Sequence, residues 1–215
     1  MTDDPWSADP DESVSDTDVG ASTPVSAKRP PKKQSSARAF FDWIVVVTVA
    51  LLVAFVVRGF VLAHFVVDGQ SMATTLDTGD RVFVNKLSYR LHDPNRGDVV
   101  VLHQITGATE RDLIKRVVAL PGETIEMTGC VVRITAPDSD VAQVLDEPYL
   151  DAPDRTPGQC GADIAPLVVE ENHVFVMGDN RGGSLDSRVL GTIEDDELVG
   201  RAFVVFWPRD HMQWL

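Results

Sequence analysis

The chain has 215 residues, of which 44% are hydrophobic and 24% charged, so it is long enough for one domain of about 150 residues plus extensions. Its formal net charge of −14 excludes a nucleic-acid-binding role for the chain as a whole. The charges are unevenly spread, because residues 1–27 carry seven acids and no Lys or Arg, whereas residues 28–38 carry five bases and no acid.

Residues 1–38 are rich in Asp, Ser, Pro, Thr and Lys, and Trp6 is their single aromatic residue before the first apolar run. Such a segment buries too little apolar surface to offset the entropy lost on ordering. We therefore predict a disordered tail over residues 1–38, and its composition indicates no specific task.

The next segment is apolar, with 15 uncharged residues from Trp43 to Val57. A bilayer needs about 20 residues, and the flanking residues supply the difference. The alternatives are a buried core helix or the apolar core of a signal peptide. A long acidic tail precedes the run and no small-x-small cleavage site clearly follows it, so we predict a transmembrane anchor over residues 39–63. The five preceding bases place the N-terminus in the cytoplasm.

The remainder, residues 64–215, has the pattern of β structure. Short runs rich in β-branched residues recur between Gly/Pro turn signals, at residues 81–86, 98–103, 113–119, 130–134, 173–177 and 202–207. We predict a mainly β extracytoplasmic domain. A Pro/Asp/Gly-rich stretch within it predicts a surface insertion around residues 130–165.

The two cysteines, Cys130 and Cys160, lie near the ends of this insertion. Neither has a Cys or His neighbour at the spacing of a structural zinc site, so no metal site is predicted. A disulfide fits an extracytoplasmic location, whereas two unpaired buried thiols are the alternative.

Three features suggest catalytic chemistry, and each alone has a structural alternative. Ser71 follows Gly69 just beyond the anchor, which is also typical of a turn. Lys115 lies among apolar, β-branched neighbours, where burial lowers the pKa of an amine and makes it available as a base; at an edge it would instead reach water. Residues 177–191 hold two Asp/Arg pairs and two Ser among four glycines. This loop could hold a site in place by ion pairs and hydrogen bonds, and the alternative is a solvated turn.

Together these features resemble the type I signal peptidases, membrane-anchored proteases with a Ser/Lys dyad. The resemblance runs from the anchor to Gly191. Its motifs are Ser71-Met72, Gly79-Asp80, residues 96–100, Lys115-Arg116-Val117 before Pro121-Gly122, and Gly178-Asp179-Asn180-Arg181 with Ser184, Asp186, Ser187 and Arg188. It implies a β catalytic domain of antiparallel sheets behind one N-terminal transmembrane helix.

The resemblance also implies a role for each residue. Ser71 would be the nucleophile, with its backbone N–H as an oxyanion donor, and Lys115 would be the general base. Ser184 would orient the Lys115 amine by a hydrogen bond, and Met72 would line the substrate pocket. Four residues would support the site as ion pairs: Arg116, Asp179, Asp186 and Arg188.

Two positions depart from the family pattern. Some members have a Ser two residues before the nucleophile, which supplies a second oxyanion donor; Gly69 has no hydroxyl, so that donor is unassigned here. Thr74 replaces a Pro that is frequent in the family, a change that we expect to be tolerated.

The implied activity is removal of N-terminal signal peptides from exported preproteins, by cutting after a small-x-small motif such as Ala-x-Ala. The enzyme would need no cofactor and no metal. It would reside in the plasma membrane as a single-pass protein in contact with lipid, with the catalytic domain outside the cytoplasm.

Three other functions compete with this interpretation. A Ser-His-Asp hydrolase would need a Gly-x-Ser-x-Gly elbow, which Ser71 lacks. A repressor-type Ser/Lys autoprotease would need a DNA-binding module, which residues 1–38 cannot form. A membrane-tethered β domain that binds partners without catalysis is the non-enzymatic alternative.

Overall fold

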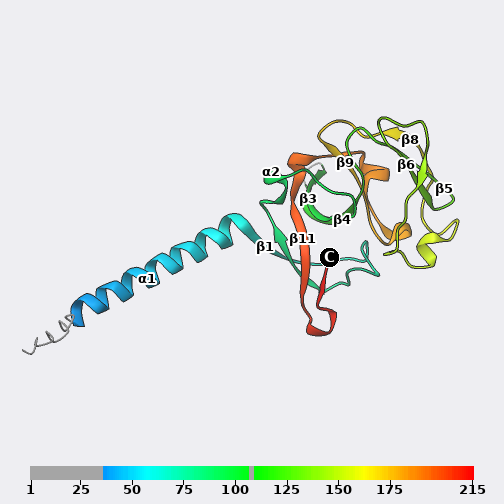
Figure 1. Ribbon diagram of the computed structural model, residues 1–215. Coiled ribbons are helices and arrows are strands. Elements are labelled where there is room, and N and C mark those ends of the chain that lie inside the picture. The colour runs from blue at the N-terminus through cyan, green and yellow to red at the C-terminus, as the bar shows by residue number, and fades with distance from the viewer. Residues whose placement is uncertain (1–35, 107–108) are drawn as a thin grey trace, which may run out of the picture. The chain divides into compact units, whose positions relative to one another are not determined.

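The computed structural model describes residues 36–106 and 109–215 of the chain (Figure 1). The predictions for residues 1–35 lie outside this part. Two structural units meet between Ile44 and Val45, inside the first helix.

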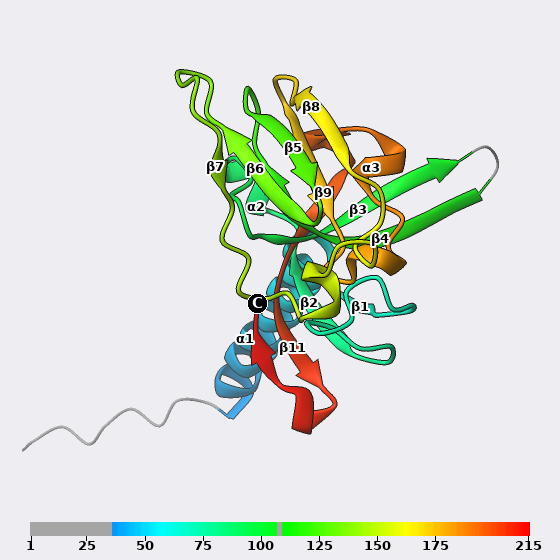
Figure 2. The ribbon, with the colours of Figure 1, turned by 90° about the vertical axis from the view of Figure 1, so that its right-hand side faces the viewer.

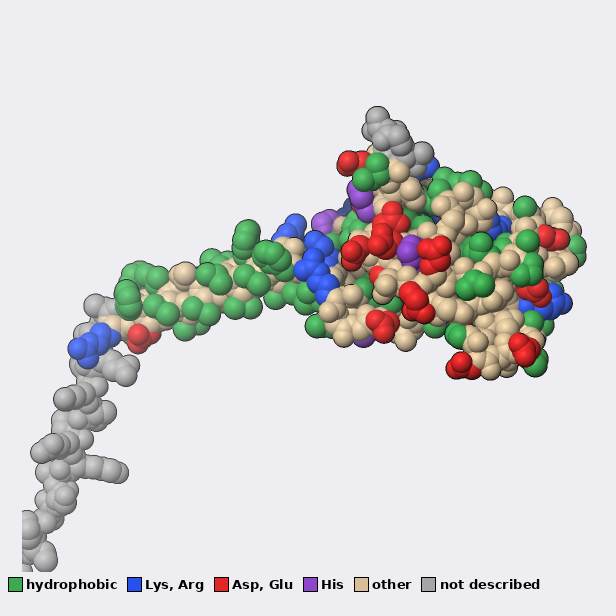
Figure 3. Space-filling view, turned by 90° about the horizontal axis from the view of Figure 1, so that it is seen from above, with side chains coloured by type: hydrophobic (Ala, Val, Ile, Leu, Met, Phe, Trp, Pro, Cys, Tyr) green, Lys and Arg blue, Asp and Glu red, His purple; other side chains and the backbone are tan. Residues whose placement is uncertain are grey.

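Helix α1 (Ser36–Val56) continues into a π-helical turn, η1 (Val57–Val61). The 24 residues Arg38–Val61 are long and apolar enough to cross a membrane, and the most apolar part of this stretch is not buried in the protein. Figure 3 shows hydrophobic side chains along the visible side of α1, with charged side chains near its N-terminal end. A helix that is apolar all round, without a protein partner, suits the interior of a bilayer.

The helical segment ends at Val61, before the predicted end of the anchor at residue 63. The next residues form strand β1 (Leu62–Val66), which pairs antiparallel with β2 (Arg81–Asn85) from Leu62 opposite Asn85 to Val66 opposite Arg81. Hydropathy alone could not place this boundary, because β1 is itself largely apolar.

Eight strands form the larger sheet, in the order β1-β2-β11-β3-β4-β9-β10, with β12 paired to β11. The remaining strands of this sheet are β3 (Val99–Thr106), β4 (Thr109–Ala119), β9 (His173–Met177), β10 (Ile193–Glu194), β11 (Leu198–Trp207) and β12 (Gln213–Trp214). All its pairings are antiparallel, and Figure 2 shows β3 and β4 as a long hairpin.

Four strands form the smaller antiparallel sheet, in the order β7-β6-β5-β8. They are β5 (Thr124–Thr128), β6 (Val131–Thr135), β7 (Gln143–Val144) and β8 (Ile164–Val168). Short helical turns complete the domain: α2 (Ser88–Leu91), α3 (Ser187–Leu190), η2 (Pro153–Arg155), η3 (Arg181–Gly183), η4 (Asp195–Glu197) and η5 (Arg209–His211).

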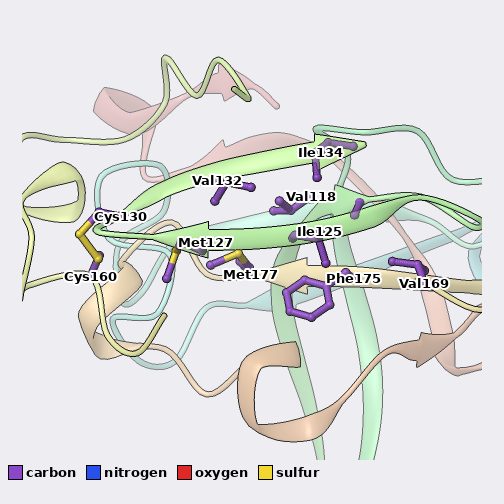
Figure 4. Packing of buried hydrophobic residues seen from close by; sticks show 11 residues of the cluster. Val118, Ile125, Met127, Cys130, Val132, Ile134, Cys160, Val169, Phe175 and Met177 are labelled. Carbon is purple, nitrogen blue, oxygen red and sulfur yellow. A yellow bond between two sulfur atoms is a disulfide. The ribbon is translucent and has the colours of Figure 1, made fainter. Parts of the chain in front are cut away.

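A buried apolar cluster joins the two sheets (Figure 4). Ile125 and Val132 of the smaller sheet pack with Val118, Phe175 and Met177 of the larger one. Cys130 and Cys160 belong to the same cluster and form a disulfide, with their Cα atoms 5.6 Å apart. The disulfide alternative is therefore the one found.

The predicted fold class is confirmed: the domain is mainly β and antiparallel, behind one N-terminal apolar helix. A strand lies at each of the six predicted β segments. Missed strands such as β7, β10 and β12 are two residues long, too short for a period of two to appear in the sequence.

Candidate active site

Ser71 lies in the loop that connects the neighbouring strands β1 and β2. Reciprocal backbone hydrogen bonds close the base of this loop, from Val67 N to Asp80 O (2.8 Å) and from Gly79 N to Val67 O (2.9 Å). Met72 and Leu76, each 1% exposed, anchor it in an apolar cluster. Ser71 therefore projects from a loop whose two flanks are held in the core.

Lys115 reaches Ser71 from the middle of β4. Its amine donates a hydrogen bond to Ser71 Oγ (2.9 Å) and another to the Ile114 carbonyl (2.8 Å). Only 1% of Lys115 is exposed. The two residues singled out as a dyad, 44 positions apart in the sequence, are thus in direct contact.

The environment of Lys115 makes its amine easy to deprotonate. Burial lowers the pKa of Lys115 to about 8, because a charged amine loses hydration in the protein interior. The carboxylates of Asp186 and Asp179 oppose this shift, whereas the Arg111 guanidinium adds to it. A base with a pKa near neutrality can hold and release a proton under ordinary conditions.

Arg116, the residue after Lys115, pairs with Asp179, which lies two residues after the end of β9. The pair is bidentate, with Nε 2.9 Å from Oδ1 and Nη2 2.7 Å from Oδ2. Thr75, on the Ser71 loop, donates to the same carboxylate. The fully buried Asp179 carboxylate therefore links β4, the segment that follows β9 and the Ser71 loop through these hydrogen bonds.

Asp186 and Arg188 form the second predicted ion pair. Arg188 Nη2 lies 2.7 Å from Asp186 Oδ2, and the Gly178 N–H donates to the same oxygen (3.0 Å). Although burial acts to raise it, the Arg188 guanidinium and the Gly178 N–H hold the pKa of Asp186 below its usual value. Asp186 thus stays ionised and closes residues 178–188 into a rigid loop.

The expected hydrogen bond between Ser184 and Lys115 is not formed. Ser184 Oγ is buried and has no hydrogen-bond partner among the described residues. A Cβ on Gly178 would collide with both Ser184 Oγ and the Ser71 carbonyl oxygen, so Ser184 still packs near Ser71. Because the Lys115 amine is directed to Ser71 and Ile114, this arrangement gives Ser184 a packing contact instead of an orienting bond.

Sequence reasoning missed several supporting residues. Asn180 donates its backbone N–H to the Ser71 carbonyl (3.1 Å) and its side-chain amide to the Gln70 carbonyl (2.9 Å). Arg181, 1% exposed, forms a buried ion pair with Glu147. Asn180 and Arg181 lie inside the quoted motif, but Glu147 is in the predicted surface insertion, where no local signal marked it.

A small cleft of about 110 Å³ opens beside the dyad. Its walls come from β1 with the residues that follow it and from β4, and the lining residues are Phe65, Val66, Val67, Asp68, Ser71, Met72, Asp112, Leu113, Ile114 and Lys115. Met72 therefore contributes to the cleft while most of its side chain is in the core. Across residues 36–106 and 109–215, no His/Cys/Asp/Glu cluster suited to a metal ion is found.

Comparison with known proteins gives consistent matches. The family model described as signal peptidase, peptidase S26, matches residues 40–207. Signal peptidase I S of Bacillus subtilis (strain 168) is 35% identical over 185 residues, covering 83% of this chain and 95% of that protein. Signal peptidase I of Bacillus amyloliquefaciens is 36% identical over 191 residues, covering 86% and 98%. A solved signal peptidase I of Enterococcus faecalis V583 aligns over 51% of this chain and 97% of that chain, with a TM-score of 0.41 and 27% identity.

Proposed function

Because this chain belongs to the signal peptidase family, we propose that Ser71 is the nucleophile and Lys115 the general base with which it removes signal peptides from exported preproteins. The observation that carries this assignment is the 2.9 Å hydrogen bond between Lys115 Nζ and Ser71 Oγ, made by a lysine that is almost fully buried. Ser71 does lie in a turn, but neither a serine that serves only the turn nor a lysine that reaches water at a strand edge would need this contact.

In the proposed acylation step, the neutral Lys115 amine takes the Ser71 hydroxyl proton while Oγ attacks the scissile carbonyl carbon. The tetrahedral intermediate collapses when the C–N bond breaks, and the Lys115 ammonium returns the proton to the leaving amine of the mature protein. A water molecule, deprotonated by the same amine, then cleaves the ester with the signal peptide and regenerates Ser71.

The Ser71 backbone N–H is the proposed donor to the oxyanion. In the described part of the chain it has no hydrogen-bond acceptor, although the carbonyl of the same residue is held by Asn180. A donor fixed before the reaction stabilises developing charge without reorganisation. Gly69 adds no side-chain donor, so any second donor comes from elsewhere.

We infer that the substrate binds as an extended strand between β1 and β4. β1 pairs with β2 and lies at the edge of the sheet. β4 pairs with β9 only from Arg116 onward, so among the described residues its stretch before Lys115 has one edge without a strand partner. An added strand would hydrogen-bond to such edges and send alternate side chains the same way. A cleft of about 110 Å³ is small compared with ordinary ligand pockets, which favours the Ala-x-Ala type of sequence.

Membrane attachment follows from the family and the apolar helix α1, whereas the orientation is part of the proposal. The five bases of residues 28–38 support a cytoplasmic N-terminus, which puts the catalytic domain on the outer side of the plasma membrane. The anchor would then hold Ser71 close to lipid, where the cleavage sites of exported preproteins emerge.

The test is cleavage of a purified preprotein with an Ala-x-Ala site, in detergent, by the wild type, Ser71→Ala, Lys115→Ala and Lys115→Arg. We expect each variant to lose about 10³-fold or more in kcat/KM while remaining folded, because the dyad acts as a unit. Activity in Lys115→Arg would contradict the base assignment, since a guanidinium cannot give up its proton near neutral pH. Activity in Ser71→Ala would require another nucleophile.

A further inference from the structure

The segment Leu145–Gly161, which we call the strap, connects β7 to β8. Its composition predicts a surface loop, yet Glu147, Leu150, Asp154 and Cys160 are buried. Two buried carboxylates in a connecting loop need partners, because an isolated ionised group is costly to remove from water. Their partners lie in the loop of residues 178–188 that borders Ser71.

Glu147 makes the first of these contacts. Its carboxylate accepts hydrogen bonds from both terminal nitrogens of Arg181 and another from the Tyr149 hydroxyl (2.8 Å). Arg181 in turn donates from Nε to the Gly178 carbonyl (3.0 Å). A buried, bidentate ion pair therefore connects the strap to the backbone of Gly178.

Further contacts hold the strap along its length. Asp154 accepts the backbone N–H of Arg181 (2.7 Å), and the Cys160 carbonyl accepts from Arg188 Nη1 (2.6 Å). The centroid of the Tyr149 ring lies 4.0 Å from Cζ of Arg116, and Arg116 is the residue that follows Lys115. The strap begins directly after β7, which pairs with β6, and near its other end Cys160 forms the disulfide with Cys130.

Gly178 transmits the position of the strap to the dyad. A Cβ at Gly178 would strike Ser184 Oγ and the Ser71 carbonyl, so the backbone there is in close contact with the nucleophile residue. The neighbouring Asn180 N–H also donates to that carbonyl (3.1 Å). A shift of Gly178 would therefore move Ser71 relative to Lys115 and open the packing around the amine.

We propose that Glu147 is a positioning residue, which acts through Arg181 and Gly178 to keep Ser71 against a buried Lys115 amine. The strap holds Glu147 in place. The Cys130–Cys160 disulfide fixes the end of the strap whose Cys160 carbonyl is bound by Arg188. This inference rests on the proposed Ser71/Lys115 chemistry and adds a residue from outside the family motifs.

The test compares Glu147→Gln with Asp146→Asn, a matched loss of one negative charge at an exposed neighbouring position of the strap. We expect Glu147→Gln to lower kcat about tenfold or more with little change in KM, because small misplacements of catalytic groups are costly. The rise of kcat/KM with pH should also move to higher pH in this variant, because water that reaches Lys115 raises the pKa of its amine toward the ordinary value. Asp146→Asn should match the wild type.

A role confined to stability would give a different result. Glu147→Gln would then lose activity in proportion to its unfolded fraction, with an unmoved pH profile, and that outcome would overturn the proposal. If Glu147→Gln does not fold, Tyr149→Phe and the Cys130→Ser/Cys160→Ser double variant decide the question. Each should shift the profile in the same direction by a smaller amount, and unshifted profiles in both would equally refute it.

The same assay includes Ser71→Ala, which separates the two proposals. An inactive Ser71→Ala beside a Glu147→Gln variant with wild-type kinetics refutes the positioning role alone. An active Ser71→Ala refutes the dyad itself, whatever Glu147→Gln shows.

Discussion

Lys115 and Arg181 are two buried basic residues whose charged ends have opposite kinds of partner: Lys115 donates to Ser71, and Arg181 donates to Gly178 and pairs with a carboxylate. Lys115 and Arg181 are each 1% exposed. Within the described residues, the Lys115 amine donates to two neutral oxygens, those of Ser71 and Ile114, and to no carboxylate. The Arg181 guanidinium instead makes an ion pair with Glu147.

This difference matches the roles that we propose for the two residues. Burial without a hydrogen-bonded counter-charge destabilises the protonated amine and lowers the pKa of Lys115 to about 8, as a base requires. Burial with a bidentate counter-charge keeps a guanidinium charged and fixed in direction, as a structural brace requires. In the proposed mechanism, equal burial thus gives a reactive amine at Lys115 and a rigid support at Arg181.

The largest expected effect is on the supporting side. Arg181→Met should lower the free energy of unfolding by about 3–5 kcal/mol, because it leaves the Glu147 carboxylate buried without its partner. Urea unfolding monitored by circular dichroism measures the change. The Glu147→Gln/Arg181→Met double variant should lose less than Arg181→Met alone, and a larger loss would mean that the two side chains are not coupled.

Removing the charge of Lys115 should change the free energy of unfolding in the opposite direction, so that the protein becomes more stable. The folded-state pKa of about 8 lies below the ordinary 10.5, so the charged amine opposes folding below pH 8, by up to about 3 kcal/mol at 1.36 kcal/mol per pKa unit. Lys115→Met should therefore stabilise the inactive protein at pH 7, by up to that amount. The gain should shrink as the pH rises from about 8 to 10.5, because the wild-type amine is then neutral when folded.

Chemical denaturation of wild type and Lys115→Met at pH 7 and pH 10.5 measures this difference. A Lys115→Met variant as unstable as Arg181→Met would show that the two cations are held alike, contrary to the comparison.

The pH dependence of activity should show the same lowered pKa. Below about pH 8, kcat/KM should fall about tenfold per pH unit, because in the proposed mechanism only the neutral Lys115 amine can accept the Ser71 proton. Initial rates on a peptide without ionisable side chains, from pH 5.5 to 9, would measure this. A flat profile between pH 6 and 8 would exclude Lys115 as the base.

The smallest effect concerns the shared carboxylate of Asp179. Thr75→Val removes the hydroxyl donor to Asp179 while Arg116 continues to hold the carboxylate, so we expect a loss of about 1 kcal/mol in stability. Thermal unfolding measures it. Thr128→Val is the control, since Thr128 is exposed and its hydroxyl has no hydrogen bond within the described residues. Equal losses of stability in both variants would mean that the Thr-to-Val change itself, and not the lost hydrogen bond to Asp179, causes the effect.

Much of this protein could be predicted from its sequence because the signals are local. The apolar run preceding Arg58 predicts a helix, and β-branched runs such as residues 173–177 predict strands through side-chain alternation. Ser71 and Lys115 were identified by motif resemblance, and the antiparallel pairing of β1 with β2 and of β3 with β4 brings them together.

Tertiary structure decided the rest. No local sequence pattern shows that Glu147 pairs with Arg181, 34 residues away, or that Cys130 is bonded to Cys160. Both contacts depend on how the strap packs against the rest of the domain. The end of the helix at Val61 was likewise decided by backbone pairing of β1 with β2, which overrides hydropathy. The sequence alone named Ser71 and Lys115 as the candidate reacting residues, because their motifs are local. The burial of Lys115 and its contact with Ser71 arise from groups that only the folded chain brings together.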